Sequence, residues 1–401
     1  MKNSFQIIAL AVLTGLIVFS LIGESGATLS KSDKKKKAKK QDIKTFEGPV
    51  GESVEERGLL APVIKVKDII SQNAAYHKDA QHVKVHNDTK VLAYVTPWNN
   101  KGYEIAETFT NKFDLISPVW LQVKRGAEGS YQITGEHDID NGWMARLRKN
   151  NPAIQIVPRL LFDGWKGEDF VSVLKSQSEQ SRLGQLFAKT CQKHKFDGLV
   201  LEFWSQLGGQ AKEPLAGMTS IIARTMKKEG FATILVLPPI RHRELEYFDR
   251  TDFDRLAKDV DFFSLMTYDF SSVQRPGPSS PLPWMKDCVE GLVPDSDDEN
   301  RRKILLGLNF YGMDFTINGG GPILGRDFIK ILDNVKPNEK LKYDDNSEEN
   351  FIELKKGDSS HIVFYPTPFS VLKRLRLAEE LNSGISIWEI GQGLDFFYEL
   401  L

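Results

Sequence analysis

The side chains best suited to chemistry are carboxylate, aromatic and amide groups at the ends of short apolar runs. Aromatic faces stack on the apolar faces of sugar rings, while carboxylates and amides bind sugar hydroxyls. The candidate ligand-binding residues are Trp388, Tyr268, Asp269, Glu202, Trp204, Met266, Arg159, Trp120 and Asn309. This combination suits a saccharide better than a phosphate or a hydride donor.

These residues require a fold that brings strand ends to one face. From Lys90 onward, β-branched and apolar runs alternate with helix-like segments. The predicted strands are 91–95, 115–123, 154–161, 198–203, 233–237, 262–267, 304–310 and 385–390, and the predicted helices between them include 171–194, 215–229 and 369–382. This alternation predicts an α/β fold, a closed (β/α)8 TIM barrel with its active face at the C-terminal strand ends.

An open doubly wound sheet is the competing architecture. Such a sheet usually carries a Gly-rich phosphate loop after its first strand, whereas here that strand is followed by Thr96-Pro97-Trp98-Asn99. The seventh connection, 313–368, is too long for a simple loop. A Gly-rich turn at 318–322 and three runs at 340–345, 350–355 and 361–365 predict a small β-rich insertion between strands seven and eight.

The N-terminal region differs in composition from the remainder. Lys2, an apolar run at 7–22 and small residues at 25–27 predict a signal peptide at 1–27, and therefore a secreted or lysosomal protein. A retained membrane anchor is the alternative, but the run is short and basic residues follow it. We expect a flexible basic leader at 28–60, either solvated or in contact with anionic glycans or lipid head groups. Folded structure should begin between 42 and 90, with a first helix at 68–76.

Composition narrows the possible partners. The 53 Lys and Arg residues balance the 54 Asp and Glu residues, so nothing in the overall charge indicates a nucleic acid. Scattered histidines without a Cys/His cluster predict no metal site, and we expect no cofactor. Cys191 and Cys288 are too few for a disulfide framework, although a single bridge stays open. Asn87 begins an N-glycosylation sequon.

One segment, 196–204, resembles the fourth-strand motif D-G-x-D-x-D-x-E of family 18 glycoside hydrolases, the chitinases. Further matches are Met-Thr-Tyr-Asp at 266–269, Gly-Leu-Asn-Phe-Tyr-Gly at 307–312 and Gly-Ile-Ser-Ile-Trp-Glu at 384–389. The resemblance runs from about Lys90 to the C-terminus, and the compact insertion resembles that of spore-cortex hydrolases in the same family. The resemblance to the family implies that an N-acetylated sugar binds above Trp388, and that a scavenger-type receptor is a partner.

The departures from the motif bear on catalysis. In this family the sugar's N-acetyl oxygen attacks the anomeric carbon, and the last Glu of the motif protonates the leaving oxygen. Here Asp197 matches, Val200 and Glu202 replace the two inner Asp residues, and Trp204 replaces the acid. Strand alternation predicts that 200, 202 and 204 face inward, with Glu202 about 6.6 Å below the acid position. Loss of a general acid typically costs about 10²–10⁴-fold in rate.

Three functions follow from this sequence. The first is a secreted lectin-like protein that binds N-acetylated or related oligosaccharides, including microbial glycans, without efficient hydrolysis. The second is a weak glycoside hydrolase using Glu202 or Asp269, and the third is a scaffold for a receptor or sorting partner. Glu202 can instead be a buried carboxylate paired with Arg159 or bonded to Tyr268, as the cost of burying a charge favours. Tyr268, Asp269 and Trp388 can likewise serve the barrel core rather than a sugar.

Overall fold

The computed structural model describes residues 43–86, 88–126, 129–241, 246–317, 319–356 and 359–401. The expected signal peptide at 1–27, residues 28–42 of the expected basic leader and the sequon residue Asn87 lie outside these residues. Residues from Ile43 to Leu401 belong to one compact unit.

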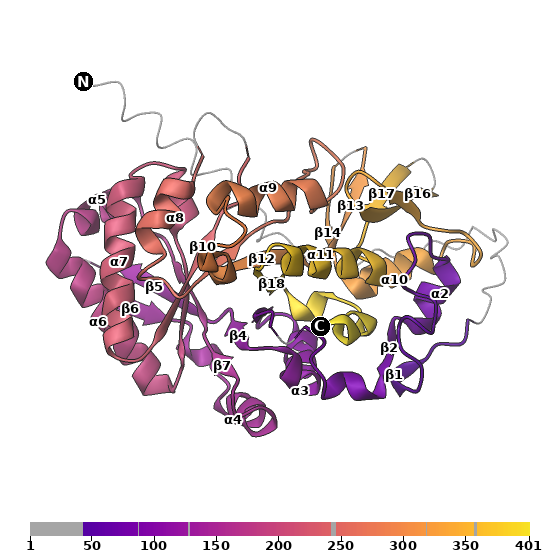
Figure 1. Cartoon of the computed structure of the whole chain (residues 1–401), viewed down its shortest axis with the longest axis horizontal. Helices are drawn as coiled ribbons and strands as arrows, with labels where there is room; N and C mark the ends of the chain where they lie inside the picture. The colour runs from indigo at the N-terminus through magenta and orange to yellow at the C-terminus, as the bar shows by residue number, and fades with distance from the viewer. Residues whose placement is uncertain (1–42, 87, 127–128, 242–245, 318, 357–358) are drawn as a thin grey trace, which may run out of the picture. The chain divides into compact units, whose positions relative to one another are not determined.

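Eight parallel strand positions close into a barrel, which confirms the predicted fold class (Figure 1). The strands are β3 (Val91–Val95), β4 (Leu115–Pro118) continued by β5 (Leu121–Arg125), β7 (Gln155–Ile156) continued by β8 (Arg159–Phe162), β9 (Gly198–Glu202), β10 (Ala232–Leu237), β11 (Phe262–Leu265), β12 (Ile304–Asn309) and β18 (Gly384–Trp388). The barrel closes because β18 pairs with β3, and β4 and β5 pair with β7 and β8. One further strand, β6 (Tyr131–Thr134), pairs antiparallel with β5.

The second and third strands are each interrupted, where continuous strands were expected. Pro118 and Pro158 stand at the interruptions, and proline has no backbone N–H for the sheet. The neighbouring N–H groups of Val119 and Val157 still donate to the adjacent strand, to Val95 O at 2.8 Å and to Ile116 O at 2.8 Å. The interruptions therefore leave the pairing of these strands with their neighbours intact.

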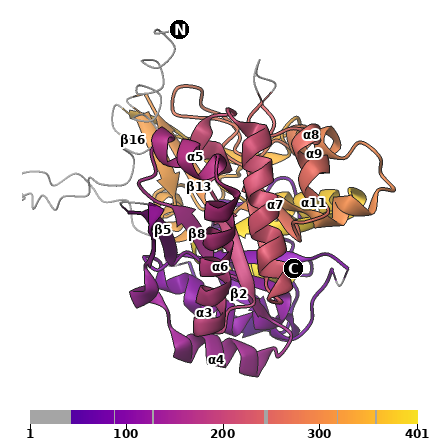
Figure 2. The ribbon, with the colours of Figure 1, turned by 90° about the vertical axis from the view of Figure 1, so that its left-hand side faces the viewer.

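Helices surround the barrel, and Figure 1 shows α5 to α8 grouped at one side. They are α3 (Asn100–Thr108), α4 (Asn141–Asn150), α5 (Gly167–Leu174), α6 (Gln177–His194), α7 (Lys212–Lys228), α8 (Arg250–Leu256), α9 (Leu282–Leu292) and α11 (Pro368–Glu380). The two longest of these helices, α6 and α7, run side by side over the strands (Figure 2). The helix expected at 171–194 is two helices, because Ser176 caps α6 by accepting a hydrogen bond from Glu179 N.

Strand alternation divides the apolar residues between two cores. Val200 on β9 faces the barrel interior, where it packs with residues such as Leu92 and Ile234. Its neighbours Leu199 and Leu201 belong to the larger core between the barrel and its helices. This alternation is the reason that each strand end presents a side chain to the barrel mouth, by which we mean the C-terminal ends of the eight strands.

The β-rich insertion between strands seven and eight is present. It is an antiparallel sheet in the order β14 (Gly319–Ile323), β13 (Gly312–Thr316), β17 (Ser359–Phe364), β16 (Glu349–Lys356) and β15 (Lys342–Asp344), with helix α10 (Gly325–Leu332). The Gly-rich segment expected to be only a turn forms the edge strand β14. Gly320 has a φ of +134°, and a Cβ there would lie 2.1 Å from Asp314 O, so glycine is needed at this position.

The folded unit begins before residue 60, where the flexible leader was predicted to end. Strand β1 (Glu47–Val50) pairs in parallel with β2 (Ala74–His77), and Val54 and Leu59 are buried. The first helix, α2, spans Val66–Gln72, so the expectation of helix through 76 is wrong. Residues 74–77 are extended because they pair with β1, and the Tyr76 ring packs against that of Phe109 with centroids 4.8 Å apart.

Short 3-10 helices complete the chain. They are η1 (Lys78–Gln81), η2 (Thr110–Lys112), η4 (Glu136–Asp138), η5 (Trp204–Leu207), η6 (Glu299–Lys303), η7 (Ile390–Gln392) and η8 (Asp395–Leu400). Within the part of the chain that the structure describes, no helix combines the length and apolar character needed to cross a membrane.

Candidate functional site

Trp388 ends strand β18 at the barrel mouth. Its side chain is half-buried and packs on the inner core together with Met266. The Trp388 ring lies 5.1 Å from the ring of Tyr94, at an interplanar angle of 56°. The peptide bond that joins Trp388 to Glu389 is cis. Trp388 and Met266 thus lie at the barrel mouth, as the sequence predicted.

Arg159 and Glu202 form an ion pair across the neighbouring strands β8 and β9. Arg159 Nε donates to Glu202 Oε2 at 2.6 Å, and the side chains are 14% and 32% exposed. The pairing with Arg159 that the sequence offered as one alternative is therefore confirmed. Arg159 holds one carboxylate oxygen of Glu202, while the exposed part of the group can still meet a ligand.

Below Trp388, Tyr94 begins a polar chain through the inner core. Its hydroxyl donates to Ser264 Oγ at 2.8 Å, and Ser264 donates to Ser386 Oγ at 3.2 Å. Burial raises the pKa of Tyr94 well above its usual value, and the charges of Glu202 and Arg159 reach the same hydroxyl. Tyr94 was not among the predicted site residues, although strand alternation from Leu92 could have placed it inward.

Asp269 and Tyr311 form the other polar contact at the mouth. The Tyr311 hydroxyl donates to Asp269 Oδ1, and the Tyr311 ring meets that of Tyr268 edge-on at 6.3 Å. Desolvation raises the pKa of Asp269, while the hydrogen bond from Tyr311 opposes the rise. Asp269 is exposed as a residue, but its carboxylate is desolvated and is held in place by the hydroxyl of the buried Tyr311.

These contacts define one group of side chains, which we call the mouth cluster. Burial raises the pKa of Tyr268 well above its usual value, and the charges of Asp269, Glu202 and Arg159 also act on its hydroxyl. The mouth cluster consists of Tyr94, Arg159, Glu202, Met266, Tyr268, Asp269, Tyr311 and Trp388. It combines flat aromatic faces with two carboxylates and one guanidinium group, which are types of group that can contact a sugar ring.

Trp204 is not part of the mouth cluster, which corrects the sequence prediction. Strand β9 ends at Glu202, the chain turns at Phe203, and Trp204 begins η5. The Trp204 side chain is 1% exposed in the outer core, where it meets Phe248 edge-on at 5.0 Å and donates to Tyr247 O at 2.7 Å. Trp204 therefore does not share the inward face of Val200, and it neither stacks on a ligand nor fills the space of a leaving group.

Trp120 is also misplaced by the sequence argument. It is fully buried in the outer core, where its Nε1 donates to the Tyr103 hydroxyl at 2.8 Å and its ring meets Trp143 at 5.9 Å. The large aromatic side chain packs helices α3 and α4 on the barrel. Trp98, by contrast, is 64% exposed beyond the end of β3 and is an aromatic surface that the candidate set omitted.

Asn309 supports the site rather than lining it. Its amide Nδ2 donates to Tyr311 O at 2.8 Å, and its Oδ1 accepts from Ser280 Oγ at 2.7 Å. The side chain is buried and both ends of the amide are engaged. The prediction that Asn309 contacts a ligand is therefore wrong, and its role is to fix the chain next to Tyr311.

Glu389 is a fully buried carboxylate directly after Trp388. Its oxygens accept from Asn99 Nδ2 at 2.6 Å and from Gly391 N at 2.8 Å. Desolvation raises the pKa of Glu389 to about 7, and the hydrogen bonds from Asn99 and Gly391 oppose the rise. Glu389 thus joins the end of β18 to the loop after β3 that carries Trp98.

The described cysteines and histidines do not gather into a metal site. Cys191 and Cys288 are both free and buried, so the open question of a bridge is settled, and burial raises the pKa of Cys288 to about 12. His82 and His86 stand four residues apart, but outside any helix, and His86 Nδ1 contacts Glu379 Oε1. Among the described residues, no three His, Cys, Asp or Glu side chains gather to hold a metal ion.

Solved structures with the same fold are found among sugar-cleaving enzymes. The chitinase of Chromobacterium violaceum ATCC 12472 shares 21% identity with this chain at a TM-score of 0.65, and the match covers 78% of this chain and 98% of the other. The spore cortex-lytic enzyme SleL of Bacillus megaterium QM B1551 shares 19% identity at a TM-score of 0.64, over 77% and 72% of the two chains. At these identities the similarity shows the shared fold.

Comparison of sequences reaches the same group of proteins. The cortical fragment-lytic enzyme of Bacillus anthracis is 22% identical over 225 residues, which are 55% of this chain and 52% of that enzyme. The chain thus matches about half the length of this curated relative. The model of the Glycosyl hydrolases family 18 matches residues 90–393, which include the whole barrel from β3 to β18 and the inserted sheet. This chain therefore belongs to family 18 of the glycosyl hydrolases.

Proposed function

We propose that this chain is a lectin-like member of its family, which binds N-acetylated or related oligosaccharides without hydrolysing them efficiently. One observation carries the proposal. The mouth cluster keeps the aromatic and polar groups that a sugar needs, while β9 ends without a carboxylic acid at the last position of the motif. Within the family, the chain would then group with the chitinase domain-containing, chitinase-like proteins.

Binding would rest on complementary contacts at the barrel mouth. The partly exposed face of Trp388 offers a platform for the apolar face of a sugar ring. Asp269, held by the Tyr311 hydroxyl, offers a fixed hydrogen-bond acceptor, and the exposed part of Glu202 offers another. The chitinase with the same fold supports a β-linked N-acetylglucosamine oligomer as the first ligand to test.

Weak hydrolysis follows from the positions of two residues. Trp204 replaces the family's proton donor in the sequence, and its side chain packs into the outer core. Glu202 is the last inward carboxylate of β9, but it is tied to Arg159 at 2.6 Å. No carboxylic acid of β9 is then free to protonate a leaving oxygen, a step that typically contributes about 10²–10⁴-fold.

Titration of N-acetylglucosamine oligomers into wild type and Trp388→Ala tests the binding half of this proposal. We expect Trp388→Ala to weaken binding by about tenfold, because loss of a stacked aromatic costs on the order of 1 kcal/mol or more. Phe46→Ala, which removes an exposed ring outside the barrel, is the control. Equal affinities of Trp388→Ala and wild type would remove Trp388 from the site.

A weak glycoside hydrolase is the second candidate, because Asp269 is held by Tyr311 at the barrel mouth and desolvation raises the pKa of its carboxyl group. Such a group can hold a proton at a higher pH than an ordinary Asp and could serve as an acid. Slow turnover of the oligomer that disappears in Asp269→Asn, with binding retained, would favour this candidate over the lectin.

A receptor-binding scaffold is the remaining candidate function. We also propose that the protein enters the secretory pathway, is secreted or delivered to lysosomes, and is glycosylated at Asn87. Expression in animal cells tests the routing. We expect protein in the medium whose mobility shifts after glycosidase treatment, and no shift in Asn87→Gln. Capture by a scavenger-type receptor that persists in Trp388→Ala would favour the scaffold over the lectin.

A further inference from the structure

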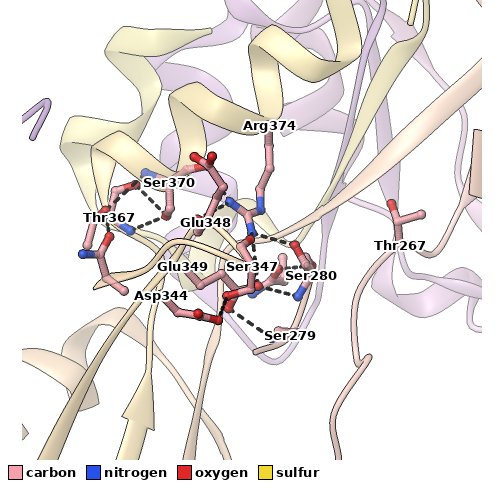
Figure 3. A network of polar contacts seen from close by, with 12 residues as sticks. Thr267, Ser279, Ser280, Asp344, Ser347, Glu348, Glu349, Thr367, Ser370 and Arg374 are labelled. Carbon is pink, nitrogen blue, oxygen red and sulfur yellow. Dashed lines mark hydrogen bonds and ion pairs between the residues drawn. The ribbon is translucent and has the colours of Figure 1, made fainter. Parts of the chain in front are cut away.

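A buried ion pair joins the inserted sheet to the barrel. Glu349 begins β16, Arg374 lies on helix α11, and Arg374 Nη2 donates to Glu349 Oε1 at 3.1 Å. The side chains are 11% and 6% exposed. Figure 3 shows Arg374 pointing from α11 into a network formed by the turn between β15 and β16 and by the segment around Ser280. A charge pair this deeply buried is costly unless further hydrogen bonds satisfy it.

Those further hydrogen bonds connect the pair to the chain that follows β11. Glu349 accepts from Ser279 N at 3.0 Å and from Ser280 N at 2.5 Å. Arg374 donates to Ser280 O at 2.6 Å and to Ser370 O at 2.8 Å. The backbone of Ser280 is thus held on both its N–H and its carbonyl by one buried ion pair (Figure 3).

Two chains of hydrogen bonds, which we call the first and second routes, connect Ser279 and Ser280 to Asp269. In the first, Ser279 Oγ accepts from Asp269 N at 3.2 Å, and Ser279 O accepts from Phe270 N at 2.9 Å. In the second, Ser280 Oγ donates to Asn309 Oδ1 at 2.7 Å, and Asn309 Nδ2 donates to Tyr311 O at 2.8 Å. The Tyr311 hydroxyl then donates to the Asp269 carboxylate.

Asp269 needs such support because its backbone is in the left-handed region, with a φ of +57°. This conformation is uncommon for residues other than glycine and persists when the surrounding structure holds it. Both routes end on Asp269, one on its backbone N–H and one on its carboxylate. The direction of that carboxylate is therefore determined by contacts that begin outside the barrel.

We propose that Glu349 and Arg374 are positioning residues, through which the inserted sheet fixes Asp269 and Tyr311 at the barrel mouth and so sets the ligand affinity of the site. This inference rests on the proposed function for its effect on binding. Its structural half, control of the segment at Asp269 by Glu349, can be measured with no ligand at all.

The ligand-free test is amide hydrogen exchange in wild type, Glu349→Gln and Glu348→Gln. Glu348 is the matched control, because its side chain contacts Lys373 at 2.9 Å and Tyr343 at 2.6 Å but belongs to neither route. We expect Glu349→Gln to speed exchange at the Asp269 and Phe270 amides by about tenfold. This change in rate corresponds to the free energy of one hydrogen bond to a charged group. Unchanged exchange at these amides would overturn the inference, whatever the protein binds.

The binding test is a double-mutant cycle on N-acetylglucosamine oligomer affinity. We expect Glu349→Gln to weaken binding by about tenfold, and Glu348→Gln to change it by less than about twofold. In an Asp269→Gly background, which suits the positive φ and removes the carboxylate, Glu349→Gln should have almost no further effect. An equal effect in both backgrounds would show a general structural role and overturn the inference.

Two further outcomes are distinguishable. If wild type binds no oligosaccharide, the proposed function fails, while the exchange experiment still decides the positioning role. If Glu349→Gln does not fold, Ser280→Ala takes its place, because it removes only the Ser280 hydroxyl link to Asn309. We expect Ser280→Ala to weaken oligomer binding by about fivefold. An affinity equal to that of wild type would contradict the second route.

Discussion

At the scale of single residues, Glu389 carries a proton-linked part of the stability. It is completely buried, and desolvation raises its pKa from 4.5 to about 7. The folded state therefore binds more protons than the unfolded state between these pH values. The stabilising contribution is fully present below about pH 4.5 and is lost as the pH rises through about 7.

Urea unfolding of wild type and Glu389→Gln at pH 5 and pH 8 measures this contribution. A rise of this size corresponds to about 3 kcal/mol of unfolding free energy in wild type. We expect the loss of stability between the two pH values to be smaller in Glu389→Gln by about that amount. Glu353→Gln, an exposed residue paired with Lys342, is the control. An identical pH dependence in wild type and Glu389→Gln would contradict the assignment.

Trp204 gives a second prediction, because its side chain points away from the barrel interior. In Trp204→Glu, which restores the residue type of the family motif, the new carboxylate would face Phe248 in the outer core. We expect stability to fall by several kcal/mol, and no gain of hydrolysis, because a buried unpaired charge is strongly unfavourable. A well-folded Trp204→Glu protein that cleaves N-acetylglucosamine oligomers would contradict the position of this side chain.

The residue types of the site could be predicted from the sequence better than the directions in which their side chains point. Trp388 and Glu202 lie at the barrel mouth because each ends a regular strand, and Met266 directly follows the end of β11. Arg159 begins β8, one layer deeper, and reaches Glu202 from there. Trp204 was misplaced because β9 ends at Glu202, and alternation no longer applies beyond a strand's end. Asn309 was misplaced because its partner Ser280 lies 29 residues away, and sequence periodicity contains no information on that contact.

At the scale of elements, the barrel strands were predictable because buried parallel strands have continuous apolar runs. The errors occurred where local chemistry overrides such runs. Proline interrupts the second and third strands, a Ser cap divides α5 from α6, and pairing with β1 keeps Tyr76 extended. The edge strand β14 was read as a turn because glycine usually marks turns, whereas here it permits close approach of β13.

Gly320 and Gly321 provide a test of that close approach within one strand. A Cβ at Gly320 would meet Asp314 O at 2.1 Å, and its φ is +134°, whereas nothing lies within 4 Å of a Cβ at Gly321. We expect Gly320→Ala to lower unfolding stability by about 1–3 kcal/mol and Gly321→Ala to change it by less than about 0.5 kcal/mol. Thermal unfolding measures both. Equal melting temperatures would mean that β13 and β14 do not approach as described.

At the scale of the whole folded unit, its first and last segments pack together. Arg57 and Glu399 form an ion pair whose side chains are 4% and 5% exposed, and Val54 N donates to Glu399 Oε2 at 2.7 Å. The segment before β2 is thereby held against η8. Residues 43–60 contribute to the fold for this reason, although the order of their apolar residues shows no helix or strand periodicity.

The free energy of this contact can be measured with Glu399→Gln. Removal of the charge leaves Arg57 buried beside a neutral group, so we expect a loss of about 3–5 kcal/mol in urea unfolding. Glu353→Gln, which breaks the exposed contact of Glu353 with Lys342, should cost no more than about 1 kcal/mol. Comparable losses in the two variants would argue against burial of the Arg57–Glu399 pair.

The central claim is that the protein binds sugar without efficient hydrolysis. The most direct test is to incubate wild type with N-acetylglucosamine oligomers, to follow the length of the oligomers by mass spectrometry and to measure the amount of bound sugar. We expect saturable binding and oligomers that stay at full length throughout the time course. Progressive shortening of the oligomers by wild type, abolished in Glu202→Gln while binding persists, would contradict this account.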